Sequence, residues 1–451
     1  MKLTLIKPRL GHSEDGKYRD KAVMEPLVMA ILKALTPDDV EVEFFDDRIE
    51  EIKIDEDSDL VAITVETFTA KRAYQIASEY RKRDVKVILG GYHPTHMPME
   101  SIEYADSVYI GDAEDKWLEV IEDVKKGKLK QFYHSKNGMS KDCLIPDRSI
   151  FKGKKYLPVG LVQFSRGCYF DCNFCSVSSF YNKKYHFKAI DHLIAEIESQ
   201  PKKLLLFADD NVVMSHKLSK DLFRELIPLK IKWASEADIN MANDLELMDL
   251  MKESGCIGQL VGFESVEEDS LRAMKKTPNL LKFDSYKEKL EIIKDYGLFI
   301  WGAFTIGHDF DTQRSLDSIL EFSRIHKFIL ADFNVLMPYP KTQLYNQLAK
   351  ENRLLYDGKW WLHPDYRFGK STFIPAHFSP DELADACYDA RLKYFTIGSI
   401  LKRAFDFKVN MRSLYSIGIY SLLNYLSYND AIKKQDIILG APKVEGISLN
   451  Q

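Results

Sequence analysis

The chain has few cysteines for its length, six in 451 residues, which excludes a disulfide-stabilised extracellular scaffold. It also lacks an excess of positive charge, because 63 Lys and Arg are set against 68 Asp and Glu, a net charge of −5. A general nucleic-acid-binding protein is therefore not expected. Internal repeats and low-complexity stretches are missing as well. With 45% hydrophobic and 29% charged residues, the composition is typical of two or three globular domains.

Long apolar runs are also missing. Residues 1–7 are typical of a short strand, not of a charged head followed by an apolar run, so no signal peptide is expected. The apolar run over residues 414–426 is too short, and too rich in Ser, Tyr and Asn, to span a bilayer. These absences predict a reducing, cytoplasmic location.

Three of the six cysteines, Cys168, Cys172 and Cys175, lie within eight residues. At this cysteine content, a Cys-x3-Cys-x2-Cys spacing arises by chance in about one chain in a thousand. Three thiolates can hold three irons of a 4Fe-4S cubane cluster and leave the fourth iron open for a small-molecule ligand. A structural zinc site would need a fourth ligand, for which His186 is the nearest residue, and a disulfide would leave one thiol over. The other cysteines are expected to be free buried thiols: Cys143, Cys256 and Cys387.

The cysteine triplet and its flanks, residues 164–167 and 176–178, resemble the radical S-adenosylmethionine (radical SAM) family. The resemblance implies that the open iron binds S-adenosylmethionine (SAM), and that one electron from the cluster cleaves SAM to a 5′-deoxyadenosyl radical. The sequence suits this chemistry, because an apolar strand over 161–164 leads into a loop at Gly167, where the backbone can wrap around a cluster.

Residues 1–135 alternate strand and helix signals, as a doubly wound, Rossmann-like α/β domain does. A helix with one apolar face is expected where Ala70, Ala73, Ala77 and Tyr80 recur at three- and four-residue steps. Polar and glycine-rich turns follow the later strands at the carboxyl edge of the sheet, where open parallel sheets bind ligands. The expected strands cover residues 3–6, 40–45, 60–65, 85–89 and 107–110.

Segments 60–65, 87–94 and 110–114 make this region resemble the cobalamin-binding domain that is often fused ahead of radical SAM barrels. The Asp-x-His-x-x-Gly motif that supplies a histidine to cobalt is missing, because His12 has no Asp two positions before it. The resemblance implies cobalamin held without that histidine; the alternative is a domain that only caps the barrel. The cobalamin-binding residues that the resemblance implies are Thr64, Thr67, Gly90, Gly91 and Gly111.

Residues 136–155 are predicted to be a polar linker, and a second α/β region follows over 156–345. Its short apolar strands end in polar residues and are separated by helical segments such as 245–253, which predicts a partial (β/α)6 barrel of the TIM type. The six expected strands cover residues 161–164, 204–207, 231–234, 258–261, 298–304 and 331–335.

Polar residues at these strand ends match the radical SAM pattern, although a helix cap would explain any single one of them. The resemblance implies that Asp209 or Asp210 receives the SAM ammonium and that the Gly-x-Glu-Ser element at 262–265 contacts the ribose or the methionyl group. A carboxylate suits both tasks, because it accepts charge-assisted hydrogen bonds. The SAM-binding residues implied are Phe174, Asp209, Asp210, Asn211, Glu236, Glu264 and Ser265.

Three of the site residues have a more specific interpretation. Phe174 would contact the adenine of SAM, or alternatively pack under the cluster loop. His308 is a candidate catalytic residue in a run that usually closes the barrel in this family. Tyr339 is a candidate catalytic residue as a substrate contact or a neighbour of the radical.

Residues 346–451 are predicted to form a mainly helical third region. Residues 379–382 give a strong helix start, with a hydroxyl cap followed by proline. We expect these helices to pack on the barrel; the alternative is an interfacial surface with peripheral membrane contact, since basic and aromatic residues mix over 402–408. The apolar face expected after the helix start contains Leu383, Cys387, Ala390, Tyr394, Ile397 and Leu401.

Three functions follow, in order of preference. The first is a radical SAM enzyme with a 4Fe-4S cluster, SAM and cobalamin that methylates an unactivated carbon of a small-molecule or lipid-like substrate. Such an enzyme would need an external electron donor such as flavodoxin or ferredoxin. The second is a cobalamin-free radical SAM enzyme that cyclises, rearranges, desaturates or couples its substrate. The third is a non-catalytic iron-sulfur protein for electron transfer or binding, against which the carboxylates at the strand ends argue.

Overall fold

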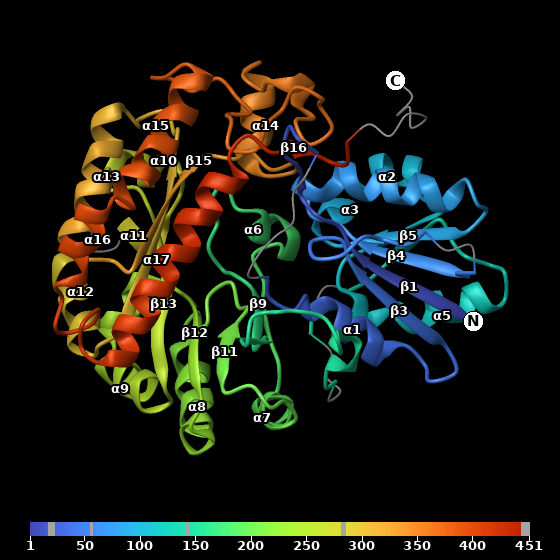
Figure 1. Ribbon diagram of the computed structural model, residues 1–451, viewed down its shortest axis with the longest axis horizontal. Coiled ribbons are helices and arrows are strands. Elements are labelled where there is room, and N and C mark those ends of the chain that lie inside the picture. The colour runs from blue at the N-terminus through green and yellow to red at the C-terminus, as the bar shows by residue number, and fades with distance from the viewer. Residues whose placement is uncertain (17–22, 55–56, 137, 140–143, 281–285, 443–451) are drawn as a thin grey trace.

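A computed structural model shows an α/β molecule built on two parallel sheets that lie side by side, with helices at the C-terminal end (Figure 1). The structure describes residues 1–16, 23–54, 57–136, 138–139, 144–280 and 286–442. Cys143 and part of the expected linker lie outside these residues.

The first sheet has six parallel strands in the order β3-β1-β4-β5-β6-β7. The five expected strands are all present, and β7 was not predicted because it is a three-residue segment that only its pairing with β6 identifies. The strands are β1 Lys2–Lys7, β3 Glu41–Asp46, β4 Leu60–Thr64, β5 Lys86–Gly90, β6 Ser107–Ile110 and β7 Phe132–His134.

Helices cover both faces of this sheet. The apolar side chains of α1 and α5 pack on one face against Leu3 and Leu5. Those of α2, including the predicted Ala70 and Ala73, pack on the other against Val61. The helices are α1 Leu27–Leu35, α2 Ala70–Arg81, α3 Tyr92–His96, α4 Pro98–Tyr104 and α5 Trp117–Lys125.

The second sheet is parallel and open, in the order β15-β14-β13-β12-β11-β8, and this confirms the partial six-stranded barrel. Burial alternates along β14, because every second residue faces the barrel interior. The strands are β8 Gly160–Val162, β11 Leu204–Phe207, β12 Lys232–Ala237, β13 Cys256–Glu264, β14 Phe299–Ile306 and β15 Leu330–Val335.

Helices follow the barrel strands, and the one expected over 245–253 is found at those residues as α9. A small antiparallel pair, β9 Ser165–Gly167 with β10 Tyr185–Phe187, frames the cysteine loop. The helices are α6 Ser176–Tyr181, α7 Ile190–Glu198, α8 His216–Leu226, α9 Leu245–Glu253, α10 Glu268–Ala273, α11 Thr277–Leu280, α12 Tyr286–Asp295, α13 Gln313–Ile325 and α14 Gln343–Lys350.

The C-terminal region contains α15 Pro380–Tyr394, α16 Ile397–Ala404 and α17 Leu414–Lys434. The predicted capping box at Ser379 is present, and α15 packs through Leu383 as expected. The expectation for Ile397 and Leu401 was wrong, because they are 78% and 55% exposed. The helix ends at Tyr394, and a new cap at Thr396 starts α16 in a different register.

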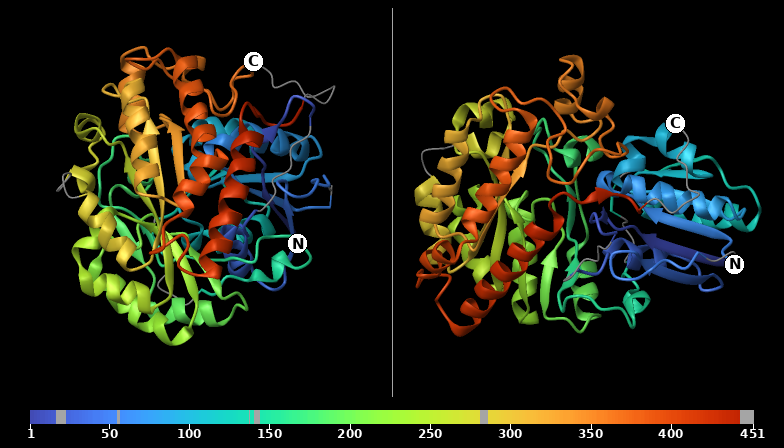
Figure 2. Two further views of the ribbon diagram at one scale, coloured as in Figure 1. Left: turned by 60° about the vertical axis from the view of Figure 1, so that its left-hand side comes forward. Right: turned by 45° about the horizontal axis from the view of Figure 1, so that its top comes forward.

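The end of the described chain returns to the first sheet (Figure 2). The two-residue strand β16, Ile438–Leu439, pairs antiparallel with β2, Gly11–His12. His12 therefore lies in this pairing, and its Nδ1 is 2.9 Å from the Ser13 carbonyl oxygen. Among the described residues, no helix combines the length and apolarity that a bilayer crossing requires.

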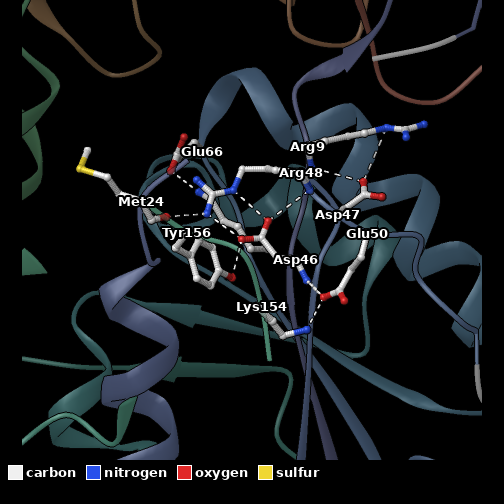
Figure 3. A network of polar contacts seen from close by, with 10 residues as sticks. Arg9, Met24, Asp46, Asp47, Arg48, Glu50, Glu66, Lys154 and Tyr156 are labelled. Atoms are coloured by element: carbon white, nitrogen blue, oxygen red, sulfur yellow. Dashed lines mark hydrogen bonds and ion pairs between the residues drawn. The ribbon is translucent and has the colours of Figure 1, made fainter. Parts of the chain in front are cut away.

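A polar network fixes the chain that leads into the barrel to the carboxyl end of β3 (Figure 3). Asp46 accepts hydrogen bonds from Arg48 Nε and Nη2 at 2.8 and 2.7 Å, and from the Tyr156 hydroxyl at 2.9 Å. Its backbone N–H donates to Glu50 at 2.8 Å, and Glu50 also binds the Lys154 ammonium. The end of the expected linker and the residue after it are thus anchored at the edge where parallel sheets bind ligands.

Candidate functional site

The cysteine triplet lies on the tight loop between β9 and α6. Gly167 precedes it with φ of +85°, and a Cβ there would lie 2.1 Å from the Lys184 carbonyl oxygen, so only glycine fits. The Cys175 N–H donates to the Cys172 carbonyl at 3.2 Å, which closes the turn. The five described cysteines are all free thiols, and Cys172 is 8% exposed.

Asn173 ties this loop to the rest of the barrel mouth. Its N–H donates to the Met274 carbonyl at 3.0 Å, and its Nδ2 to the Ala273 carbonyl at 2.9 Å. Its own carbonyl accepts from the Leu344 N–H at 2.9 Å. The loop that carries the cysteines is therefore fixed at the end of α10 and at the start of α14.

The two aspartates after β11 hold the backbone that leads into the loop. Asp209 accepts from the N–H groups of Phe164 and Ser165 at 3.0 and 2.6 Å and from the Ser165 hydroxyl at 2.5 Å. Burial raises the pKa of Asp209 to about 7. Asp210 accepts from the Gly167 N–H at 2.8 Å. Both carboxylates, which the resemblance assigned to the SAM ammonium, serve first to anchor the loop.

Asn211 and Ser265 are used within their own turns. Asn211 donates to Asp238 at 2.9 Å and accepts from the Val213 N–H at 3.2 Å. Ser265 is fully buried and accepts from the Glu267 N–H at 3.1 Å. Neither residue caps the helix that follows it, because the N-cap positions of α8 and α10 are Ser215 and Glu267. A SAM contact by either residue stays a prediction.

Glu264 binds two residues that the sequence did not single out. Its carboxylate accepts from Lys276 Nζ and from Thr305 Oγ1, both at 2.8 Å. It has φ of +65°, at a bulge between β13 and β14. Although burial alone would lower the pKa of Lys276, the Glu264 carboxylate raises it, and so does the nearby Cys172. No sequence motif marks Lys276; only the fold brings its ammonium close to the cysteines.

Among the carboxylates predicted to bind SAM, Glu236 is the one that stays available to a ligand. It faces the barrel interior from β12 and is solvent-exposed. Within the described parts of the chain, no hydrogen bond to its carboxylate is found. The surrounding protein removes part of its hydration, and Asp210 adds repulsion, which together raise the pKa of Glu236 to about 7. A cationic group placed here would be stabilised, so Glu236 suits the SAM ammonium better than Asp209 does.

Phe174 and His308 meet at the barrel mouth, with ring centroids 6.0 Å apart and planes at 70°. His308 is 4% exposed, and burial lowers its pKa to about 4, so the ring is neutral near pH 7. Its Nε2 has no hydrogen-bond partner among the described residues. The contact of Phe174 with His308 matches the packing alternative, without testing an adenine contact.

Tyr339 lies where the three regions meet. Its ring packs against Phe68 from the first region, at 6.1 Å, and against Trp360 from the C-terminal region, at 6.4 Å. A cavity of about 360 Å³ adjoins it. Aromatic and basic side chains line this barrel-mouth cavity, among them Phe68, Phe174, Tyr339, Phe368, Lys370 and Arg391.

A second cavity, of about 470 Å³, lies at the carboxyl edge of the first sheet and is called the edge cavity below. Four of the five residues predicted to bind cobalamin line it, namely Thr64, Gly90, Gly91 and Gly111. Thr67 is not among the lining residues; it starts a short 3-10 helix and is 8% exposed. The opposite wall comes from the barrel and includes Gln163, Arg166 and Asp210.

Arg166 joins the two walls of the edge cavity. Its guanidinium lies 3.4 Å from Asp112 and 2.7 Å from Glu114, both in the turn after β6. All three side chains are nearly buried, with exposed fractions of 10% or less. The Tyr181 hydroxyl also donates to Asp112 at 3.1 Å. The residue two positions before the first cysteine of the triplet is thus paired with the predicted cobalamin edge.

The residues present fit the groups that the resemblance implies. Cys168, Cys172 and Cys175 would hold three irons, and burial raises the pKa of Cys168 to about 12 and of Cys172 to about 11, so both need the positive charge of iron to stay thiolates. Glycine backbone at the edge cavity leaves room for a large planar ligand. His186, the fourth ligand of the zinc alternative, lies in β10, with its ring centroid 6.1 Å from that of Tyr181.

Comparisons with known proteins agree with this arrangement. The family description "Radical SAM superfamily" matches residues 162–323, and "B12 binding domain" matches residues 21–121. Bacteriochlorophyllide d C-8(2)-methyltransferase from Chlorobaculum tepidum is 29% identical over 359 residues, which cover 74% of this chain and 78% of that protein. The hopanoid C-2 methylase from Rhodopseudomonas palustris is 26% identical, over 86% and 74% of the two chains.

A solved structure shares the fold over nearly the whole chain. It is the radical SAM methyltransferase TsrM from Kitasatospora setae with cobalamin and a [4Fe-4S] cluster bound, which has a TM-score of 0.63 and 14% identity and covers 96% of this chain and 98% of its own. The chain belongs to the radical SAM superfamily, in the cobalamin-dependent methyltransferase class that carries an N-terminal B12 binding domain.

Proposed function

We propose that this enzyme methylates an unactivated carbon of a small, largely apolar molecule. One observation supports this most directly: the edge cavity has the predicted cobalamin residues on one wall and Gln163, Arg166 and Asp210, beside the cluster loop, on the other. A carrier bound there would reach the site where the radical is generated. When bound, the cluster and cobalamin would supply the electron that cleaves SAM and the methyl group that is transferred.

The barrel-mouth cavity is the proposed substrate site. Phe174 lies one residue before Cys175, so a molecule in this cavity would lie next to the cluster loop. Its aromatic wall suits an apolar substrate, and Arg391 and Lys370 suit a negatively charged group on it. The relatives named above act on a bacteriochlorophyllide and on hopanoids. A pigment-like or lipid-like substrate is therefore proposed.

The chain's own residues would bind and orient the reactants. Glu236 would accept hydrogen bonds from the SAM ammonium, and Glu264, held by Lys276 and Thr305, would present a fixed carboxylate to the ribose or methionyl group. His308 is neutral, so it would add no charge beside Phe174. The aromatic side chains around Tyr339 would exclude water from a reactive radical.

An external electron donor is part of the proposal, because each methylation would consume two SAM molecules and two electrons. The products would be the methylated substrate, methionine, 5′-deoxyadenosine and S-adenosylhomocysteine. Tyr169, directly after Cys168, is 57% exposed, so the cluster loop reaches the surface where a flavodoxin or ferredoxin could bind.

The test is anaerobic reconstitution with iron, sulfide and cobalamin, followed by reduction and incubation with SAM. We expect cluster absorbance, a retained corrinoid, and both 5′-deoxyadenosine and S-adenosylhomocysteine. Cys172→Ala should lose the cluster and 5′-deoxyadenosine formation, whereas the matched control Cys387→Ala, a buried thiol outside the loop, should keep both. Formation of 5′-deoxyadenosine without corrinoid retention would instead support cobalamin-free radical chemistry. Failure of the reduced, cluster-loaded protein to cleave SAM would refute both radical proposals.

A further inference from the structure

Helix α17 places several polar side chains on the side that packs against the molecule and many apolar ones on the side that faces solvent. Its buried residues are Ser416, Tyr420 and Asn424. Asn424 accepts from Arg403 at 3.0 Å and donates to the Ile329 carbonyl at 3.2 Å, and the Tyr420 hydroxyl donates to the Ile400 carbonyl at 2.7 Å. Polar groups thus attach α17 to the molecule together with Ile419 and Leu423, which pack against the barrel core, so its inner side is more polar than usual.

The outward side of α17 is apolar. Leu414 is 89% exposed, Tyr425 67% and Leu422 56%. Leu422, Tyr425, Tyr428 and Ile432 recur at three- and four-residue steps, and Leu414 lies eight residues before Leu422, so these residues form one stripe along the helix. Neighbouring segments extend the set of exposed large apolar side chains, which we call the apolar face: Ile397, Leu401, Phe405, Phe407, Leu414, Tyr415, Leu422, Tyr425, Tyr428 and Ile432. A set of this size on one region marks an interaction surface.

The charge around the apolar face indicates the kind of partner surface that binds it. Residues 391–434 contain eight Lys and Arg but only two Asp and Glu, a net charge of +6 in a chain whose net charge is −5. Both acids are engaged, because Asp406 caps the N–H groups of Lys408 and Val409, and Asp430 pairs with Lys434 at 3.0 Å. Two of the bases are engaged as well, since Arg403 is fully buried and Lys408 pairs with Glu291 and Asp295. Lys402, Arg412 and Lys433 are exposed, so the solvent-facing charge of this region is positive. A second copy of the same basic surface would repel this one. An anionic surface would attract it.

We propose that the apolar face binds peripherally to an anionic lipid bilayer, with α17 lying in the interface plane. Apolar residues would enter the boundary between headgroups and acyl chains, and Lys402, Arg412 and Lys433, all exposed, would contact lipid phosphates. Tyr side chains, three of which belong to the apolar face, are enriched at membrane interfaces. This proposal does not depend on the enzyme's reaction.

The position of α17 places the proposed membrane contact close to the proposed substrate site. The helix contacts β15, and Asp430 and Lys434 both lie close enough to Asp332 on that strand to influence its carboxylate. Arg391, which lines the barrel-mouth cavity, acts on the same carboxylate. The membrane-bound face would therefore lie beside the proposed substrate site, where a lipid-soluble substrate could enter from the bilayer.

The test is flotation of the anaerobically purified holoenzyme with vesicles of phosphatidylcholine alone or with phosphatidylglycerol added. We expect flotation with the anionic vesicles, weakened by salt. A Leu414→Ser, Leu422→Ser, Tyr425→Ser triple variant should bind at least about tenfold more weakly. The matched control Leu118→Ser, Leu245→Ser, at two exposed apolar positions elsewhere (57% each), should bind like the wild type.

A second measurement keeps the proposal testable if the triple variant folds poorly. Anionic vesicles should slow amide hydrogen exchange over residues 397–434 of the wild type and leave α9 unchanged, and Lys402→Glu, Lys433→Glu should abolish this protection. Absence of flotation and of protection with anionic vesicles would overturn the proposal. So would a dimer in solution that the triple variant converts to a monomer, because a second copy would then cover the face.

Discussion

Arg166 is a nearly buried cation of the site that was not chosen as a site residue from the sequence. It pairs with Asp112 and Glu114 across the junction of the two sheets, and all three side chains are nearly buried. Sequence reasoning missed this because the partners are about fifty residues apart. The signals that could have found it were a basic residue just before the cluster loop and an acidic turn after the fifth strand.

Replacing Arg166 with Met should destabilise the protein by about 3–5 kcal/mol, because two buried carboxylates lose their counter-charge. Adding Asp112→Asn and Glu114→Gln to Arg166→Met should restore most of that stability, since the unpaired charges are then removed. Urea unfolding under anaerobic conditions measures both effects. Arg272→Met, which breaks an exposed pair with Glu268, is the control and should change stability by less than about 1 kcal/mol. Equal effects of Arg166→Met and Arg272→Met would contradict the buried network.

His326 should make stability depend on pH. Burial, with Lys294 nearby, lowers its pKa to about 4, whereas an unfolded histidine has a pKa of about 6.5. The unfolded chain therefore binds the proton first as the pH falls, and stability should decrease from about pH 6.5 toward pH 4, by at most about 3 kcal/mol. His326→Gln should flatten this decrease in urea titrations at several pH values. The exposed His377→Gln should keep it, and identical slopes in the two variants would disprove the assignment.

Helices and strands were predictable where a local pattern sufficed. The helix α9, the strand β11 and the capping box of α15 have the predicted residues, because their signals lie within one segment. The break between α15 and α16 was not predictable, since the three- and four-residue spacing continues through it. The run over 414–426 is apolar, as its sequence indicates. Only the tertiary contacts reveal that polar residues of α17 take part in its packing against the rest of the molecule.

The cap of α15 should be energetically significant. The Ser379 hydroxyl accepts from the Glu382 N–H at 3.2 Å, and Glu382 accepts from the Ser379 N–H at 2.7 Å. Ser379→Ala should cost about 1 kcal/mol of local stability and speed amide hydrogen exchange in the first turns of α15. Ser421→Ala, in the exposed middle of α17, should have no such effect. Unchanged exchange in α15 would show that tertiary packing alone holds the helix start.

The pairing of β2 with β16 joins the end of the described chain to the first region of the molecule. A Cβ at Gly11 would lie 1.9 Å from the Ile438 carbonyl oxygen, so Gly11→Val should break the pairing. We expect faster proteolysis around residues 435–440 and faster hydrogen exchange there. Gly398→Ala, at a position with nothing within 4 Å, is the control and should leave both unchanged. Resistance of Gly11→Val to proteolysis would mean that other contacts, such as that between Gln75 and the Ala441 N–H at 2.7 Å, suffice.

This pairing is one of several connections between the B12-type domain and the rest of the molecule, besides the linker and the buried Arg166 network. Lys154 and Tyr156 hold the end of the linker through side-chain hydrogen bonds, whereas β16 is a two-residue strand whose hydrogen bonds contribute only about 0.5–1.5 kcal/mol each. We therefore expect this strand pair to open locally more readily than the buried Arg166 network. Its opening would release the end of the described chain and leave the edge cavity intact, because the described lining of that cavity includes no residue of β2 or β16.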